Sequence, residues 1–211
     1  MNLTQHQSRI PIFAAVIFVC VMSPLAAEAH LNSTGMGPIY DGLMHFLMSP
    51  EDLVPVLALA LLSGLRGATY GRRTLFVLPA AWLLGGSIGL AASASNGSAI
   101  ISAVWFLLVG GLLAADAKLS LRVTTALAVM LGLYHGYLNG AGLGLSISSA
   151  AVLLGLIFAV FVLIALAAAF VVQLQASWAR IAVRVAGSWI FASGLLLMGW
   201  AMRSGHGLKP L

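Results

Sequence analysis

The chain has 211 residues, of which 61% are hydrophobic and only 7% are charged. A soluble domain carries roughly a quarter of its residues as charged side chains, so this composition excludes a mostly water-exposed surface and predicts an integral membrane protein. The formal net charge is +5, but the basic residues are scattered between apolar runs and form no basic stripe, so we expect no nucleic-acid partner.

The first 29 residues have the pattern of a bacterial signal peptide. Polar residues precede an apolar run at 10–22, which is short for a membrane span. A Ser-Pro pair ends this run, and the Ala-Glu-Ala tripeptide at 27–29 supplies the small residues that signal peptidase accepts. We therefore predict a cleavable signal peptide over residues 1–29, which makes His30 the new N-terminus. An uncleaved additional helix is the alternative.

Six apolar segments follow, most of them near the roughly 20 residues that cross the hydrocarbon core of a bilayer. We predict an all-α membrane domain over residues 30–211, built as a bundle of six transmembrane helices. The predicted spans cover about residues 45–65, 75–94, 99–115, 121–138, 147–170 and 181–202. Gly85 and Gly89 stand four apart, as do Gly132, Gly136 and Gly140, and this spacing favours close packing of helices in lipid.

The basic residues predict the orientation of this bundle. Seven of them lie between spans one and two, three and four, or five and six, whereas the other two connections carry no charge and only two basic residues follow the last span. Cytoplasmic connections carry the excess of Lys and Arg. We therefore predict a protein of the bacterial inner membrane with both mature ends in the periplasm, which agrees with export by the signal peptide.

Polar residues that could bind a metal ion gather toward the predicted periplasmic face. They are His30, Asp41, His45, Glu51, Asp52, His135 and Asn139. Within this set, Asp41 with His45 and His135 with Asn139 have i,i+4 spacing, so each pair shares one face of a helix. Imidazoles and carboxylates together suit a borderline divalent metal such as nickel, cobalt, copper or zinc better than calcium or magnesium.

More ordinary roles for these residues remain open at this stage. The Ser-Pro pair at 49–50 has the pattern of a helix start, so the two acids that follow could serve only to face the positive end of the helix dipole. Asp41 and His45 could form a polar pair in the headgroup region. His135 could be a buried histidine bonded to a neighbouring carbonyl.

Three features resemble the HupE/UreJ family of bacterial membrane proteins, which are regarded as nickel or cobalt permeases that accompany hydrogenase and urease systems. The predicted signal peptide ends just before His30. Residues 45–52 stand where the family has His-Pro-x-x-Gly-x-Asp-His, and residues 135–140 stand where it has His-Gly-x-Ala-His-Gly. The six-span layout extends the resemblance over essentially the whole mature chain.

The match of these motifs is partial. His45 and His135 keep the first histidine of each motif, and Glu51 keeps a carboxylate where the family has Asp. Asp52 and Asn139 each replace a histidine. The resemblance therefore implies a divergent member that keeps half of the imidazole ligands.

The resemblance implies a permease that takes up a divalent transition metal from the periplasm, with no permanently bound cofactor and no enzymatic activity. The lipid bilayer and the metal ion are the expected partners, with a metalloenzyme assembly system as a further one. A non-transporting membrane accessory or metallochaperone for such an enzyme is the alternative. An intramembrane enzyme is a third interpretation, which the lack of a metalloprotease motif disfavours. The choice among nickel, cobalt and copper stays open, as does the oligomeric state.

Overall fold

The computed structural model describes residues 34–92, 97–173 and 177–205, and the regular structure in these ranges is helical throughout. The helices are α2 (Pro38–Met48), α3 (Pro50–Leu65), α4 (Ala68–Leu90), α5 (Ala99–Ala114), α6 (Leu121–Leu143), α7 (Ser149–Gln173) and α8 (Ser177–Gly205). Helices α3 to α8 fall on the six predicted spans, and the last residues of α2 overlap the start of the first span. The predicted signal peptide and His30 lie outside the described residues.

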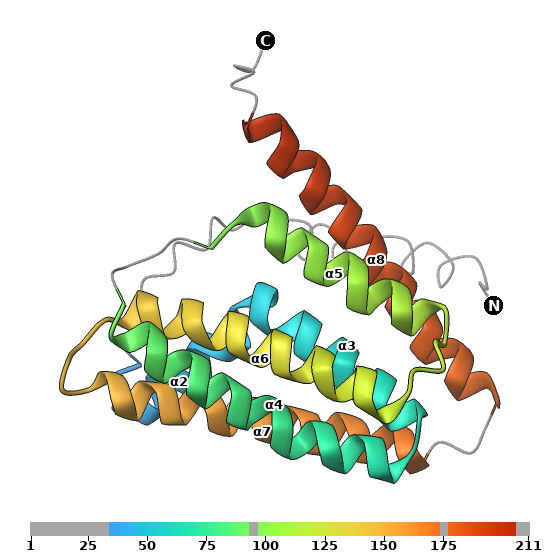
Figure 1. The fold of residues 1–211 in the computed structure, drawn as a ribbon, viewed down its shortest axis with the longest axis horizontal. Helices are drawn as coiled ribbons and strands as arrows, with labels where there is room; N and C mark the ends of the chain where they lie inside the picture. Colours follow the sequence, from blue (N-terminus) through green and yellow to red (C-terminus); the bar gives the residue numbers. More distant parts are fainter. Residues whose placement is uncertain (1–33, 93–96, 174–176, 206–211) are drawn as a thin grey trace, which may run out of the picture. The chain divides into compact units, whose positions relative to one another are not determined.

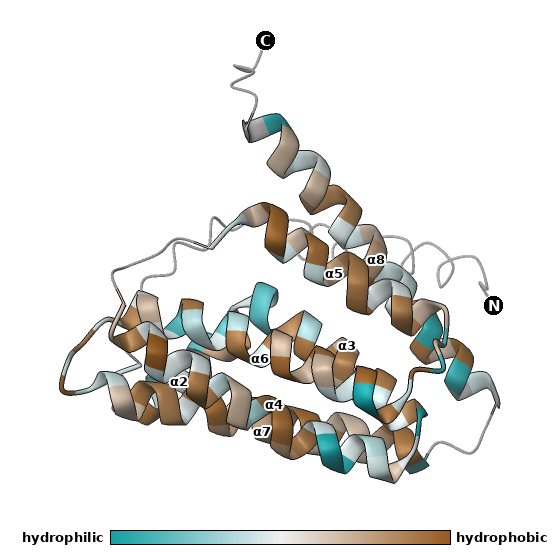
Figure 2. Ribbon diagram, viewed as in Figure 1, coloured by the Kyte–Doolittle hydropathy of each residue, from teal (hydrophilic) through white to brown (hydrophobic). Residues whose placement is uncertain are grey.

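The helices have the length and composition of membrane segments. Each of α4, α7 and α8 is long and apolar enough to cross a membrane alone, and α2 with α3 would form a fourth span if the bent pair counts as one. Helix α5 is apolar but has only 16 residues, and α6 includes Arg122, His135 and Asn139 among its 23 residues. Figure 2 shows that apolar residues run along all these helices, with hydrophilic positions mostly near their ends. The chain is therefore a helical membrane protein.

A break divides the predicted first span into α2 and α3, whose axes differ by 75°. Ser49 has an extended backbone (φ −99°, ψ 91°), and Pro50 has no N–H to continue the hydrogen bonding of α2. The predicted helix start at this Ser-Pro pair is confirmed in position. The Ser49 hydroxyl, however, donates to the carbonyl of His45 at 2.7 Å and makes no hydrogen bond to the first turn of α3.

Helix α3 lies among the other helices, because it contacts α4, α5 and α7 and supplies a large part of the apolar core. Its side chains Val56, Leu59 and Leu62 have no exposed surface. Around it, α4 packs along α6, α5 along α8, and α2 along α7 (Figure 1). The apolar part of α3 therefore lies in the interior of the bundle. Its N-terminus lies at the break after α2, and Arg66 follows its C-terminus.

Glycines set a close helix contact between α4 and α6. A Cβ at Gly136 would overlap the carbonyl of Trp82, and one at Gly140 would overlap that of Gly86. From the other side, a Cβ at Gly85 would overlap the carbonyl of Leu133. The prediction that glycines four apart serve close packing is confirmed, since the backbones of the two helices touch where the side chains are missing.

Charged residues from three predicted cytoplasmic connections meet at one end of the bundle. The carboxylate of Asp116, which follows α5, forms ion pairs with Arg66 after α3 and with Arg180 in the first turns of α8. The Arg180 Nη2–Asp116 Oδ2 distance is 2.9 Å. Burial and the nearby charge of Arg180 lower the pKa of Arg66. The connections that were predicted to share one side of the membrane are therefore together in the fold.

Substitution of Asp116 by asparagine is expected to destabilise this end of the bundle. Asp116 has a positive φ of 49°, which asparagine tolerates. The substitution therefore removes the negative charge without straining the backbone. The Arg66 side chain is only 10% exposed and would lose its carboxylate partner. We expect the free energy of unfolding in detergent to fall by about 1–3 kcal/mol. The exposed neighbour Lys118→Gln is the control, and equal stability of the two variants would contradict the role given to Asp116.

Candidate metal site

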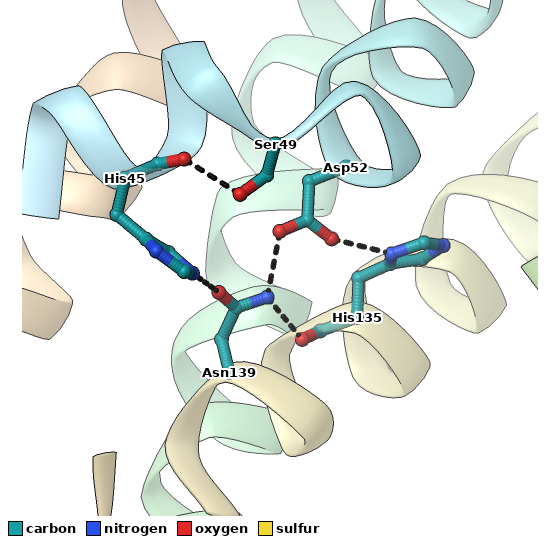
Figure 3. Close-up of polar contacts among 5 residues, drawn as sticks. All are labelled: His45, Ser49, Asp52, His135 and Asn139. Carbon is teal, nitrogen blue, oxygen red and sulfur yellow. Dashed lines mark hydrogen bonds and ion pairs between the residues drawn. The ribbon is translucent and has the colours of Figure 1, made fainter. Parts of the chain in front are cut away.

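Four of the predicted site residues meet at the break between α2 and α3 (Figure 3). His135 Nδ1 lies 2.7 Å from Asp52 Oδ1, and Asn139 Nδ2 lies 3.0 Å from Asp52 Oδ2. On the other side, His45 Nε2 lies 3.1 Å from Asn139 Oδ1. Helix α2 contributes His45, α3 contributes Asp52 and α6 contributes the other two, so the cluster joins residues up to 94 positions apart in the chain.

The hydrogen bonds fix the orientation of the Asn139 side chain. Its Nδ2 donates to Asp52 and also to the carbonyl of His135, at 2.8 Å. A flipped amide would place its oxygen against these two acceptors, so the orientation shown is the one that the surroundings allow. The Asn139 oxygen therefore accepts from His45, whose Nε2 carries the proton, and the Nδ1 of His45 keeps its lone pair.

The same reasoning assigns the protons of His135. One oxygen of Asp52 accepts from the amide of Asn139, and an ionised carboxylate offers only acceptor oxygens. His135 Nδ1 therefore carries a proton and donates a hydrogen bond to the other oxygen of Asp52. In a neutral imidazole the other nitrogen, Nε2, then keeps a lone pair. A carboxylate that holds one ring nitrogen while the other stays basic is the arrangement found around histidines that bind metals.

His135 Nε2 is buried and has no hydrogen-bond partner among the described residues. The side chain is 2% exposed. Aromatic rings cover it: Trp82 stacks on the imidazole with centroids 5.7 Å apart, Trp105 lies at 6.2 Å, and Tyr134 meets it edge-on at 5.2 Å. Most buried polar atoms in proteins are satisfied, so a nitrogen held in place by a carboxylate but left without a partner is a candidate ligand atom.

The cluster and the basic end lie at opposite ends of α3. Asp52 stands in the first turn of this helix, and Arg66 follows its last residue. Fourteen residues of helix separate them, which corresponds to about 21 Å along the axis. The first turn also places the Asp52 carboxylate at the positive end of the helix dipole, which stabilises the negative charge. The fold therefore keeps the candidate site away from the predicted cytoplasmic connections.

The other predicted site residues are not part of this hydrogen-bonded cluster. Glu51 is exposed, and it lies close enough to His45, Asp52 and His135 to interact with them electrostatically. Asp41 instead accepts hydrogen bonds from the backbone and hydroxyl of Thr34, at 2.6 and 2.7 Å. Across 34–92, 97–173 and 177–205, no three His, Cys, Asp or Glu side chains are arranged to hold a metal ion together.

Sequence reasoning missed the aromatic surroundings of His135 and the pairing of Asp52 with it. Tyr134 is adjacent to His135 in the chain, but nothing in the spacing of Trp82 and Trp105 links them to this histidine. Asp52 was open to a simpler interpretation as an acid in a first helical turn. Its burial at 5% exposure and its two side-chain partners show a more specific role.

Comparison with known proteins gives one match. The family described as HupE / UreJ protein matches residues 17–197, which is most of the chain and includes all of α2 to α7. The matched region therefore contains the whole hydrogen-bonded cluster. No curated protein and no solved structure matches the chain.

Proposed function

The chain belongs to the HupE/UreJ family, and on that premise we propose that it is a permease for a divalent transition metal of the nickel or cobalt type. The observation that carries the proposal is the buried Nε2 of His135, which has no hydrogen-bond partner among the described residues, with its ring held by Asp52. This nitrogen would bind the ion. Nickel and cobalt accept imidazole nitrogen readily, and hard cations such as magnesium prefer oxygen donors.

The position of the cluster at a helix break supports transport. Ionisable groups inside membrane bundles are costly and mark ion pathways by default. Broken helices also form the ion sites of many transporters, because their free ends place polar groups at the depth of the membrane. Here the break between α2 and α3 brings His45 and Asp52 to His135 on α6.

The small number of protein ligands also suits a transported ion. Conduction requires binding that is strong enough to admit the ion and weak enough to release it. His135 Nε2 would supply one ligand, and the lone pair of His45 Nδ1 a second one nearby. Water carried by the ion would fill the other positions, and the exposed carboxylate of Glu51 would attract the ion toward the cluster.

The proposal includes six spans, a cleaved signal peptide and a periplasmic position for both mature ends. In that orientation the cluster lies in the periplasmic half of the bundle, and Arg66, Asp116 and Arg180 lie at the cytoplasmic side. His30 would then be a free N-terminal residue on the side from which the ion arrives. With no nucleotide-binding motif in the sequence, the membrane potential or a partner protein would drive uptake.

An accessory role is the second candidate, and one observation favours it. Between Asp52 and Arg66, α3 offers a single polar side chain, Ser63, whose hydroxyl is taken up by the carbonyl of Ala60 at 2.9 Å. A protein that binds a metal at the periplasmic end and hands it to a metalloenzyme would need no polar path farther along this helix. The two candidates share the site and differ in whether the ion crosses.

Uptake into liposomes that contain the purified protein separates these candidates. With a metal-sensitive dye inside and a potential negative inside, a permease is expected to raise the internal nickel or cobalt signal well above that of protein-free liposomes. Magnesium added at the same concentration serves as the control cation. Binding of nickel or cobalt without internal accumulation would overturn the permease in favour of the accessory, and absence of both would overturn each candidate.

A further inference from the structure

The basic end of the bundle carries more positive charge than its one acid can balance. Asp116 gives one oxygen to Arg66 and the other to Arg180. Arg184 lies one turn farther along α8, and its Nε donates to the carbonyl of Ala114 at 3.0 Å, the last residue of α5. Among the described residues Arg184 forms no ion pair. Two guanidinium groups therefore share one carboxylate, and the third, that of Arg184, has no acidic partner among the described residues.

A groove lies beside this surplus charge, between the end of α5 and the first half of α8. It has a volume of about 270 Å³ and is lined by Ala114, Ile181, Arg184, Val185 and Ser188. Ile181 and Val185 are 59% and 49% exposed, so the walls face the surroundings of the protein with apolar side chains. The groove therefore combines a cation that has no acidic partner among the described residues with two exposed apolar side chains.

The start of α8 has the residue pattern of a membrane boundary, which would bring the Arg184 guanidinium within reach of lipid headgroups. Trp178 precedes it on α8 and is 70% exposed, and tryptophan gathers at the boundary between headgroups and hydrocarbon. Arg184 is six residues farther along the helix, which is about 9 Å deeper. A side chain of this length reaches back toward the boundary, and Ile181 and Val185 remain against the hydrocarbon.

We propose that this groove binds an anionic phospholipid, with the phosphate on the Arg184 guanidinium and an acyl chain along Ile181 and Val185. A basic pocket between membrane helices on the cytoplasmic side is the arrangement that recognises such headgroups. The lining favours a lipid over a free anion, since a free phosphate would leave the apolar walls without a partner. The bound lipid would balance the charge around Asp116 and hold α8 against α5.

The packing of α8 gives the proposed lipid contact a structural role. Among the described helices, α8 packs mainly along α5, through Gly110, Gly187 and Gly194. Much of its remaining surface is exposed and apolar, including Trp189 and Leu196 at 61% and 63%. A lipid that bridges α5 and α8 would therefore add contacts to α8, which packs against few other helices.

Thermal unfolding of the full chain in detergent tests the proposal with phosphatidylglycerol and phosphatidylcholine as probes. We expect phosphatidylglycerol to raise the Tm about 5 °C more than phosphatidylcholine does. Arg184→Gln is expected to lose this difference. Arg203→Gln, near the other end of the same helix, is the control and is expected to keep it.

Three results would overturn the proposal: equal stabilisation of the wild-type protein by the two lipids, an unchanged difference in Arg184→Gln, or inorganic phosphate giving the same shift as phosphatidylglycerol. If Arg184→Gln does not fold, native mass spectrometry of the wild-type protein decides. Selective retention of phosphatidylglycerol over phosphatidylcholine, with loss of that selectivity in Ser188→Trp, which fills the groove, supports the site. Equal retention of both lipids contradicts it. None of these measurements depends on metal transport.

Discussion

Replacement of His135 by asparagine is expected to abolish metal accumulation and to leave the protein folded. An asparagine amide nitrogen takes nearly the place of the imidazole Nδ1, so the hydrogen bond to Asp52, 2.7 Å in the native protein, can be kept. The lone pair at the Nε2 position is lost. We expect cellular nickel or cobalt accumulation, measured by elemental analysis, to fall at least about tenfold toward the level of cells without the protein.

Two further variants distinguish the loss of a metal ligand from a change in the packing around His135. Tyr134→Phe changes a ring that contacts His135 but removes no nitrogen ligand, so it is expected to keep most of the accumulation. His135→Ala removes the ring as well and leaves Asp52 buried without its imidazole partner, so it is expected to lower both uptake and stability. If His135→Asn accumulates metal at the wild-type rate with normal protein levels, Nε2 is not the ligand.

Replacement of Gly140 by alanine is expected to cause a large loss of stability. The added Cβ would overlap the backbone carbonyl of Gly86, and backbone cannot move away as a side-chain end can. Helices α4 and α6 would have to separate, which costs about 1–3 kcal/mol or more. Because α6 also carries His135 and Asn139, separation would pull two members of the cluster away from Asp52.

Gly142 in the same helix gives a matched control. A Cβ at Gly142 meets nothing within 4 Å, so alanine there should leave the Tm unchanged or raise it slightly. Thermal unfolding in detergent compares the two variants directly. A Gly140→Ala protein as stable as Gly142→Ala would show that the helices are not in contact at this position.

The local features of the fold could be predicted from the sequence, since they depend on neighbouring residues. The start of α3 at a Ser-Pro pair follows from the missing N–H of Pro50. The close contact of α4 and α6 follows from glycines four apart. The 75° bend before α3 could not be predicted, because its size depends on how α2 packs on α7. There Gly42 and Gly155 let the two backbones meet, 113 residues apart in the chain.

The candidate site was predictable in membership but not in organisation. The sequence identified His45, Asp52, His135 and Asn139 as candidates, because the predicted topology places all four near the same side of the membrane. Their roles depend on distances across helices: Asp52 orients His135, and Asn139 links both to His45. A carboxylate at the first turn of a helix looks the same in sequence whether it serves the dipole or an imidazole. The pairing of Asp116 with two arginines was equally invisible, since it joins residues 50 and 64 positions apart.

X-ray absorption of the purified protein loaded with nickel or cobalt tests directly whether His135 Nε2 binds the ion. We expect the bound ion to have at least one imidazole ligand in the wild-type protein and in Tyr134→Phe. We expect His135→Asn to lose the ion or part of its imidazole scattering, although Asp52 and the fold remain in place. An identical metal spectrum at equal occupancy in the wild-type protein and in His135→Asn would contradict the assignment of His135 Nε2 as the metal ligand.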